Sequence, residues 1–156
     1  MSTDLDLTHL FAIAAALGWA SGLRLYAVVF LTGMAGTLGW VPLPSGLSVL
    51  QHPAMLWTSG VLLLVEFLAD KVPWVDSLWD TVHTLIRIPA GAALAYGVFG
   101  GDQATWATVA ALLGGTLAAG THFTKAGTRA IINASPEPFT NIAASFGEDV
   151  VVLTGL

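Results

Sequence analysis

LTHLFAIAAALGWASGLRLYAVVFLTGMAGTLGWV, residues 7–41, is the stretch that decides the fold class of this chain. It is almost continuously apolar and is interrupted at Ser21-Gly22-Leu23-Arg24. One straight helix of this length would extend about 50 Å, whereas the hydrocarbon core of a bilayer is about 30 Å thick. We therefore expect two helical segments with a break near Gly22.

The composition of the whole chain points the same way. Of its 156 residues, 55% are hydrophobic and only 10% are charged, against about 25% charged in an average soluble domain. So few charges cannot cover a globule, and the apolar content exceeds what the core of one domain holds. We predict an all-α fold, a polytopic membrane helix bundle whose surplus apolar surface faces lipid.

Six apolar stretches are candidate helices of this bundle. They lie at about residues 7–20, 25–41, 54–69, 88–101, 104–121 and 139–156. Several are shorter than the roughly 20 residues that a membrane-crossing helix needs. We expect one integral membrane domain over 1–156, built from about five or six short or broken helices, with a loop over 45–53.

The segment between Pro73 and Pro89 carries a polar stripe. Its ionisable residues recur at i, i+4, i+7 and i+11, which is the spacing of one helical face. They are Asp76, Asp80, His83 and Arg87. An apolar stripe runs beside them, so we interpret the segment as an amphipathic helix on the membrane surface with its polar stripe in water. The alternative is that the stripe lines an aqueous cavity.

The basic residues predict an orientation. If all six stretches cross, the five basic residues fall on one side, and the opposite loops contain Asp4, Asp6 and Asp102 but no Lys or Arg. The positive-inside rule then places the N-terminus outside the cytoplasm, in a multi-pass protein of the cell inner membrane. Six tryptophans near the predicted ends of the stretches are consistent with aromatic belts at both interfaces.

Several classes of function have no support. The chain has no cysteine, and its four histidines show no metal-ligand spacing, so we predict no cofactor. The formal charge of −5 gives no nucleic-acid footprint. The acidic start lacks the basic region of a secretory signal, so the first apolar segment is expected to be retained. A membrane-embedded enzyme using the stripe from Asp76 to His83 ranks last, because no catalytic constellation is recognisable.

A weak internal repeat accompanies the apolar stretches. The motif Ala20-Ser-Gly-Leu-Arg24 is similar to Ala118-Ala-Gly-Thr-His122, and each precedes a Pro-x-Pro and then a pair of acids. Duplicated halves with broken helices are typical of transporters. This interpretation predicts half-repeats over about 7–72 and 104–156, linked by 73–103, with helix breaks at Gly22 and Gly120. Chance recurrence in an Ala- and Gly-rich chain is the alternative.

Carboxylates inside apolar stretches suggest the function. Glu66 and Asp70 lie four residues apart near the end of the third stretch, and Glu148 and Asp149 interrupt the last. Carboxylates at membrane depth are costly and mark cation or proton paths. The alternative for the first pair is an interfacial position in which Lys71 neutralises Asp70.

Our leading hypothesis is a small transporter or channel for an ion or small solute. In it, Glu66 and Glu148 bind the cation or proton, Asp70 and Asp149 assist, and Arg24 and His122 complete the pathway. Membrane lipid is the expected partner. A homo-oligomer is also expected, because a few short helices make a thin wall around any pathway.

A lipid-handling protein is the second hypothesis. Arg24, Lys125 and Arg129 lie near one another on the predicted topology, and together they would grip an anionic headgroup. The competing interpretation of Arg24 is that its long side chain extends to the headgroup region without binding anything.

Four motifs resemble one known family. They are EFLADKVPWVDSLWDTVHTLIR at 66–87, SPEPFTN at 135–141, GED at 147–149 and GLRLY at 22–26. In these polar motifs, and over about residues 10–152, the chain resembles an uncharacterised bacterial membrane family called domain of unknown function 4126. The resemblance implies a membrane location and no established activity.

Overall fold

The computed structural model describes residues 6–134 and 138–156, and within these ranges it contains helices and no strand. The elements are α1 (Leu7–Thr37), η1 (Ser45–Gln51), α2 (Pro53–Ala69), α3 (Pro73–Phe99), η2 (Gly101–Gln103), α4 (Ala104–Asn133) and α5 (Pro138–Gly155), where η marks a 3-10 helix. The predicted all-α class is confirmed. Residues 135–137, which form part of the motif SPEPFTN, lie outside the described ranges.

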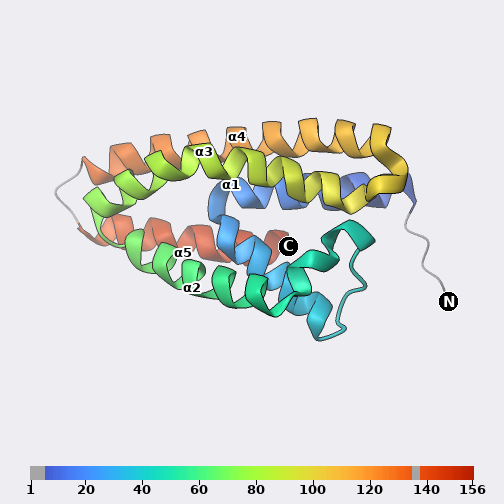
Figure 1. Cartoon of the computed structure of the whole chain (residues 1–156). Helices are drawn as coiled ribbons and strands as arrows, with labels where there is room; N and C mark the ends of the chain where they lie inside the picture. Colours follow the sequence, from blue (N-terminus) through green and yellow to red (C-terminus); the bar gives the residue numbers. More distant parts are fainter. Residues whose placement is uncertain (1–5, 135–137) are drawn as a thin grey trace.

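The long apolar run is broken inside α1. Arg24 has the non-helical backbone angles φ −142° and ψ 77°, while the residues on either side continue the helix. In Figure 1 the first part of α1 runs beside α3 and α4, and the second part turns away from them toward α2. The predicted break is therefore confirmed, two residues after Gly22. Gly22 serves close packing instead, because a side chain there would collide with Thr121 and the backbone of Ala118.

Small residues let α1, α3 and α4 approach one another closely. A Cβ atom on Gly114 of α4 would overlap the side chain of Ala95 in α3, and one on Gly18 of α1 would overlap the backbone of Gly114. Gly91 of α3 is confined in the same way by Ser21 and Ala118. Such small-residue contacts are the usual means by which membrane helices pack.

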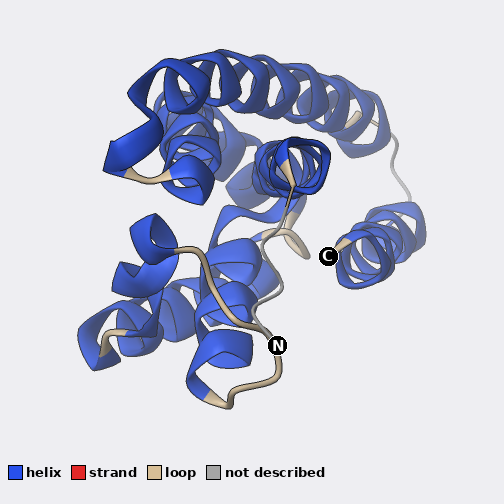
Figure 2. Ribbon diagram, turned by 90° about the vertical axis from the view of Figure 1, so that its right-hand side faces the viewer, coloured by secondary structure: helices blue, strands red, loops and turns tan. Residues whose placement is uncertain are grey.

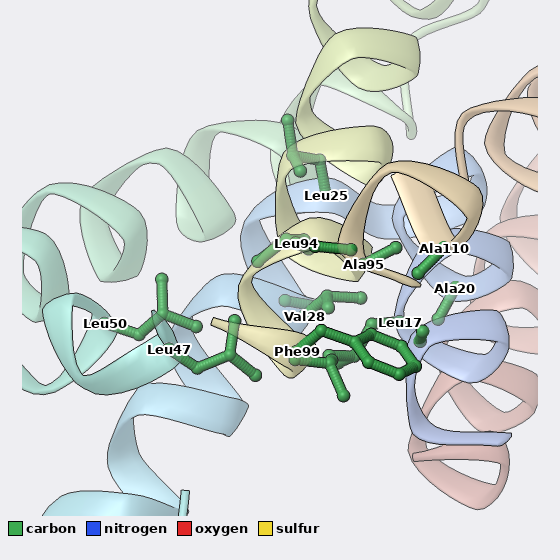
Figure 3. Close-up of a cluster of buried hydrophobic side chains, with 14 of the residues drawn as sticks. Leu17, Ala20, Leu25, Val28, Leu47, Leu50, Leu94, Ala95, Phe99 and Ala110 are labelled. Atoms are coloured by element: carbon green, nitrogen blue, oxygen red, sulfur yellow. The ribbon is translucent and has the colours of Figure 1, made fainter. Parts of the chain in front are cut away.

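An apolar core fills the end of the bundle where α3 passes into α4. Figure 3 shows Leu17 and Val28 of α1 meeting Leu47 of η1 and Leu94 and Phe99 of α3. All five are at most 7% exposed. This packing fixes the axis of the α3–α4 hairpin, and thereby the position of its other end.

The exterior of the bundle is unusually apolar. Leu85, Ile131 and Phe139 are each more than 75% exposed, and many other large hydrophobic side chains also face outward. Two helices, α1 and α3, are long and apolar enough to cross a membrane, and η1 with α2, which meet at a 67° bend, would make a third span. These features support insertion into a membrane.

The structure corrects three local expectations. The loop expected over 45–53 is replaced by η1 and the start of α2. The amphipathic helix does not end at Pro89, because α3 continues through that proline to Phe99. The expected surface helix and the fourth apolar stretch are therefore one helix. No break occurs at Gly120, which lies inside the continuous helix α4 with no atom near its Cβ position.

α5 is the most peripheral helix. In Figure 2 the helix that ends at the C-terminus stands at the edge of the bundle, and only Asn141, Ser145 and Val152 are buried along its described side chains. Two of these three residues are polar. α5 is therefore held to the rest of the protein largely by polar contacts.

The glycine packing makes a prediction with an internal control in the same helix. Gly114→Ala should lower the free energy of unfolding by about 1–3 kcal/mol, because the new methyl group overlaps Ala95. Gly120→Ala should raise it by about 0.5–1 kcal/mol, because the site is open and alanine favours the helix. Thermal unfolding of both variants in detergent tests this, and equal effects at the two positions would contradict the packing.

Candidate functional site: a buried ion network

The buried face of α3 changes character along its length. Its first half buries ionisable residues, from Asp76 to Arg87, and its second half buries small and apolar ones, from Gly91 to Phe99. α4 has the opposite order, with Ala107 to Ala118 first and then His122, Lys125 and Arg129. Because the two helices form a hairpin, their polar halves lie side by side. Acids of α3 thus meet bases of α4.

Three other helices add charges at the same place. Glu66 and Asp70 come from the end of α2, Arg24 from the break in α1, and Glu148 and Asp149 from α5. We call the resulting cluster the buried ion network. Its members are Arg24, Glu66, Asp70, Asp76, Asp80, Arg87, Lys125, Arg129, Glu148 and Asp149.

Asp70 is the most highly paired carboxylate of the network. Its Oδ2 atom contacts Arg24 Nη1, Lys125 Nζ at 3.5 Å and Arg129 Nη2 at 3.8 Å. Burial acts to raise the pKa of Asp70, but Lys125, Arg24 and Arg129 outweigh it and hold that pKa below its usual value. Asp70 is therefore the ionised centre that joins α1, α2 and α4.

A second group of charges, beside the one around Asp70, is centred on Arg87. Its Nη2 atom donates to Glu66 Oε1 at 2.6 Å, and its Nη1 atom donates to Asp80 Oδ1 at 2.9 Å. Lys125 connects the two groups, since its Nζ atom also lies 3.6 Å from Asp80 Oδ1. Glu66 and Arg87 are fully buried, so this pair is isolated from solvent.

Arg24 and Arg129 hold α5 in place. Arg24 Nη2 lies 3.0 Å from Asp149 Oδ1 and donates to both the carbonyl and the hydroxyl oxygen of Ser145 at 3.1 Å. Arg129 donates from Nε to Glu148 Oε1 at 2.9 Å and from Nη1 to the carbonyl oxygen of Asn141 at 3.0 Å. The docking of α5 thus depends on two buried guanidinium groups.

Two histidines border the network in neutral form. Arg87 Nη1 lies 3.2 Å from His122 Nδ1 and can only donate, so Nδ1 accepts and the proton sits on Nε2, which donates to Thr84 Oγ1. His83 Nδ1 faces the carbonyl oxygen of Trp79 at 2.8 Å and must donate to it. His83 Nε2 then accepts the hydroxyl proton of Tyr26 at 3.0 Å. Both rings have their hydrogen bonds satisfied without an added proton.

The charges of the network do not balance. It holds six carboxylates and four bases, and the fifth basic residue of the chain, Lys71, lies at its margin and contacts Ser145 Oγ at 3.2 Å. With every group ionised, six acids against five bases leave one negative charge. Four carboxylates also have a buried oxygen with no hydrogen-bond partner among the described residues: Glu66, Asp70, Asp76 and Asp80. Such a site is suited to take up a proton or a cation.

The structure brings together all six residues that the sequence assigned to an ion pathway, although their role in transport stays a prediction. It also places the polar stripe of α3 in the network, with Asp76, Asp80, His83 and Arg87 each at most 4% exposed. The expectation that these four side chains face water is wrong, because the bases of α4 and the acid of α2 surround them.

Several polar residues of the site were not foreseen. Asn141 and Ser145 share one face of α5 with the predicted site residue Glu148, at i, i+4 and i+7, and Asn133 continues the face of α4 that holds Lys125 and Arg129. Extending the helical spacing used for α3 to these two helices would have found them. Within the described residues, no group of three His or acidic side chains is arranged to hold a metal ion.

An apolar exterior, candidate membrane spans and an ionic interior define a helical membrane protein. The chain belongs to the family described as a domain of unknown function, DUF4126, whose model matches residues 11–156. No curated protein and no solved structure matches the chain. The family resemblance noted in the sequence is confirmed.

The pairing of Asp70 predicts a large loss of stability on its removal. Asp70→Asn should lower the free energy of unfolding by about 3–5 kcal/mol, because three buried bases lose their shared partner. Asp102→Asn is the matched control, since Asp102 is exposed in η2. Thermal unfolding of both variants in detergent measures the difference, and a loss no larger for Asp70→Asn than for the control would contradict the pairing.

The same carboxylate predicts sensitivity to acid. Because the pKa of Asp70 is lower in the folded than in the unfolded protein, its stabilising effect is complete above the usual value of 3.8 and is lost as the pH falls below it. The melting temperature of the wild-type protein should therefore decrease when the pH is lowered below about 4. Asp70→Asn should show a weaker decrease over the same pH range, and identical pH profiles would count against this assignment.

Proposed function

We propose that this protein is a small membrane transporter or channel for a proton or another small cation. The observation that carries the proposal is the buried ion network at the break of α1, with more carboxylates than bases. Ionisable groups inside membrane helices are costly and by default belong to ion or proton pathways.

The comparison between the two ends of the hairpin argues against a merely structural role. At one end, α3 and α4 pack with Gly91, Ala95 and Gly114, and this apolar contact needs no charge. Buried ion pairs are often no more stabilising than apolar residues of similar size. A bundle that needed only stability would gain little from ten ionisable side chains at its other end.

Access to the network is proposed to lie beside α5. Glu148 and Asp149 have side chains that are 16% and 23% exposed, whereas Glu66, Asp70 and Asp76 are fully buried. α5 also buries few apolar groups, so moving it away from the bundle costs little hydrophobic contact. An ion would meet Asp149 and Glu148 first, and Asp70 lies behind them, paired with the same Arg24 that holds Asp149.

Binding of a lipid headgroup has less support. Arg24, Lys125 and Arg129 are at most 3% exposed, and each already faces at least two carboxylates. An anion brought to these bases would be repelled by Asp70 and Glu148. The hypothesis would need a rearrangement of the network, whereas cation uptake uses the excess negative charge that is present.

The proposal extends to the surroundings of the pathway. We continue to expect membrane lipid as a partner, a homo-oligomer, and a location in the inner membrane with the N-terminus outside the cytoplasm. Arg24, Arg87, Lys125 and Arg129 are buried in helices and not exposed in loops, and glycosylation or cysteine-labelling maps test the orientation directly.

Flux through proteoliposomes tests the proposal. Glu66→Gln should reduce proton or monovalent-cation flux by about tenfold or more, since losing one charge-assisted contact of about 1.4 kcal/mol already has that effect. Asp102→Asn should leave the flux at the wild-type rate, because this carboxylate is exposed and outside the network. Wild-type vesicles that leak no faster than empty ones, or equal flux in Glu66→Gln, would remove the assigned role.

A further inference from the structure

One carboxylate of the network lacks a close basic partner. Five of the six have a Lys or Arg nitrogen within 3.0 Å. Asp76 differs, because its nearest base is Arg129, whose Nη1 atom lies 3.9 Å from Asp76 Oδ2. Asp76 is nevertheless fully buried. A buried carboxylate without a close counter-charge is the least stable of the six in ionised form.

The hydrogen bonds of Asp76 show which of its oxygens is free. Asn133 Nδ2 donates to Asp76 Oδ2 at 3.0 Å, and the same nitrogen contacts the carbonyl oxygen of Pro73 and Ser77 Oγ. The Oδ1 of Asn133 accepts from Asn141 Nδ2, which fixes the orientation of the Asn133 amide. Asp76 Oδ2 is thus an acceptor, and Asp76 Oδ1 is buried with no partner among the described residues.

The charged groups around Asp76 do not compensate for its ionisation. α4 contributes Arg129, which is engaged by Glu148 and Asn141. The neighbouring carboxylates Asp70 and Asp80 act against a further negative charge, and α5 presents the uncharged Asn141 on this side. One proton on Asp76 would also leave five ionised carboxylates in the network against the five basic residues of the chain.

We propose that Asp76 is the proton-binding site of the network and carries a proton on Oδ1 at neutral pH. The part of Asp76 in transport rests on the proposed function, and it names the proton as the transported ion. Binding of the proton to Asp76 does not depend on that function. Asn133 keeps Oδ2 as the acceptor and leaves Oδ1, which has no partner among the described residues, to carry the proton.

The position of α5 would control release of this proton. Arg129 is drawn from Asp76 by Glu148 and Asn141, both on α5. When α5 moves away, Arg129 loses these partners and its nearest remaining carboxylates are Asp70 and Asp76. A guanidinium freed in this way favours ionised Asp76, so opening of the α5 side and loss of the proton are coupled.

Infrared spectroscopy of the purified protein tests the inference. Wild type should show the carbonyl stretch of a protonated, buried carboxyl group at neutral pH, and Asp76→Asn should lose it. Asp149→Asn is the matched control and should keep the band, because Asp149 is paired with Arg24 at 3.0 Å. A wild type without the band, or a band unchanged in Asp76→Asn, overturns the inference.

Thermal unfolding provides a second measurement that also checks folding. Asparagine imitates protonated aspartic acid, so Asp76→Asn should leave the melting temperature at neutral pH within error of wild type, in contrast to Asp70→Asn. A decrease as large as that of Asp70→Asn would mean that Asp76 is ionised and would overturn the inference. If the infrared band of protonated Asp76 is present but wild-type vesicles show no flux, only the proposed function is refuted. If flux is present but the band is not, only the inference about Asp76 is refuted.

Discussion

The meeting of an acidic half-face of α3 with a basic half-face of α4 is the interaction on which the rest of the structure depends. It places Asp80 near Lys125 and leaves Arg87 to pair with Glu66 of α2. The break of α1 then presents Arg24 to Asp70, and α5 docks on Arg24 and Arg129. Each of the helices α1 to α5 is thus positioned by charge at one end of the bundle, while apolar packing orders the other end.

This arrangement reverses the usual distribution of polarity in a soluble protein. The chain's bases, apart from Lys71, are buried, and large apolar side chains such as Leu85 and Ile131 face outward. An apolar solvent explains both facts. Lipid contacts the apolar exterior favourably, and because it cannot solvate charges, the charged side chains pair with one another. With Lys71 counted at its margin, the network has one carboxylate more than it has bases, and binding a proton is the smallest change that removes this excess.

The sequence predicted the helical class, the break in α1 and the polar face of α3, since each follows from local spacing and apolar content. It did not predict where that face points. An amphipathic pattern identifies a polar side but cannot distinguish water from a second polar helix, and here the partner, α4, lies about 40 residues further along the chain. Gly120 illustrates the opposite error, because a local resemblance to the Gly22 motif does not reproduce the contacts that surround Gly22.

A double-mutant cycle between Glu66 and Arg87 is the most direct test of the central claim, that buried charges from different helices pair with one another. The two residues lie on α2 and α3, are fully buried and approach to 2.6 Å. Unfolding of Glu66→Gln, Arg87→Met and the double variant in detergent should give a coupling energy of about 1.5–3 kcal/mol or more. Additive effects, with no coupling between the two positions, would contradict the account.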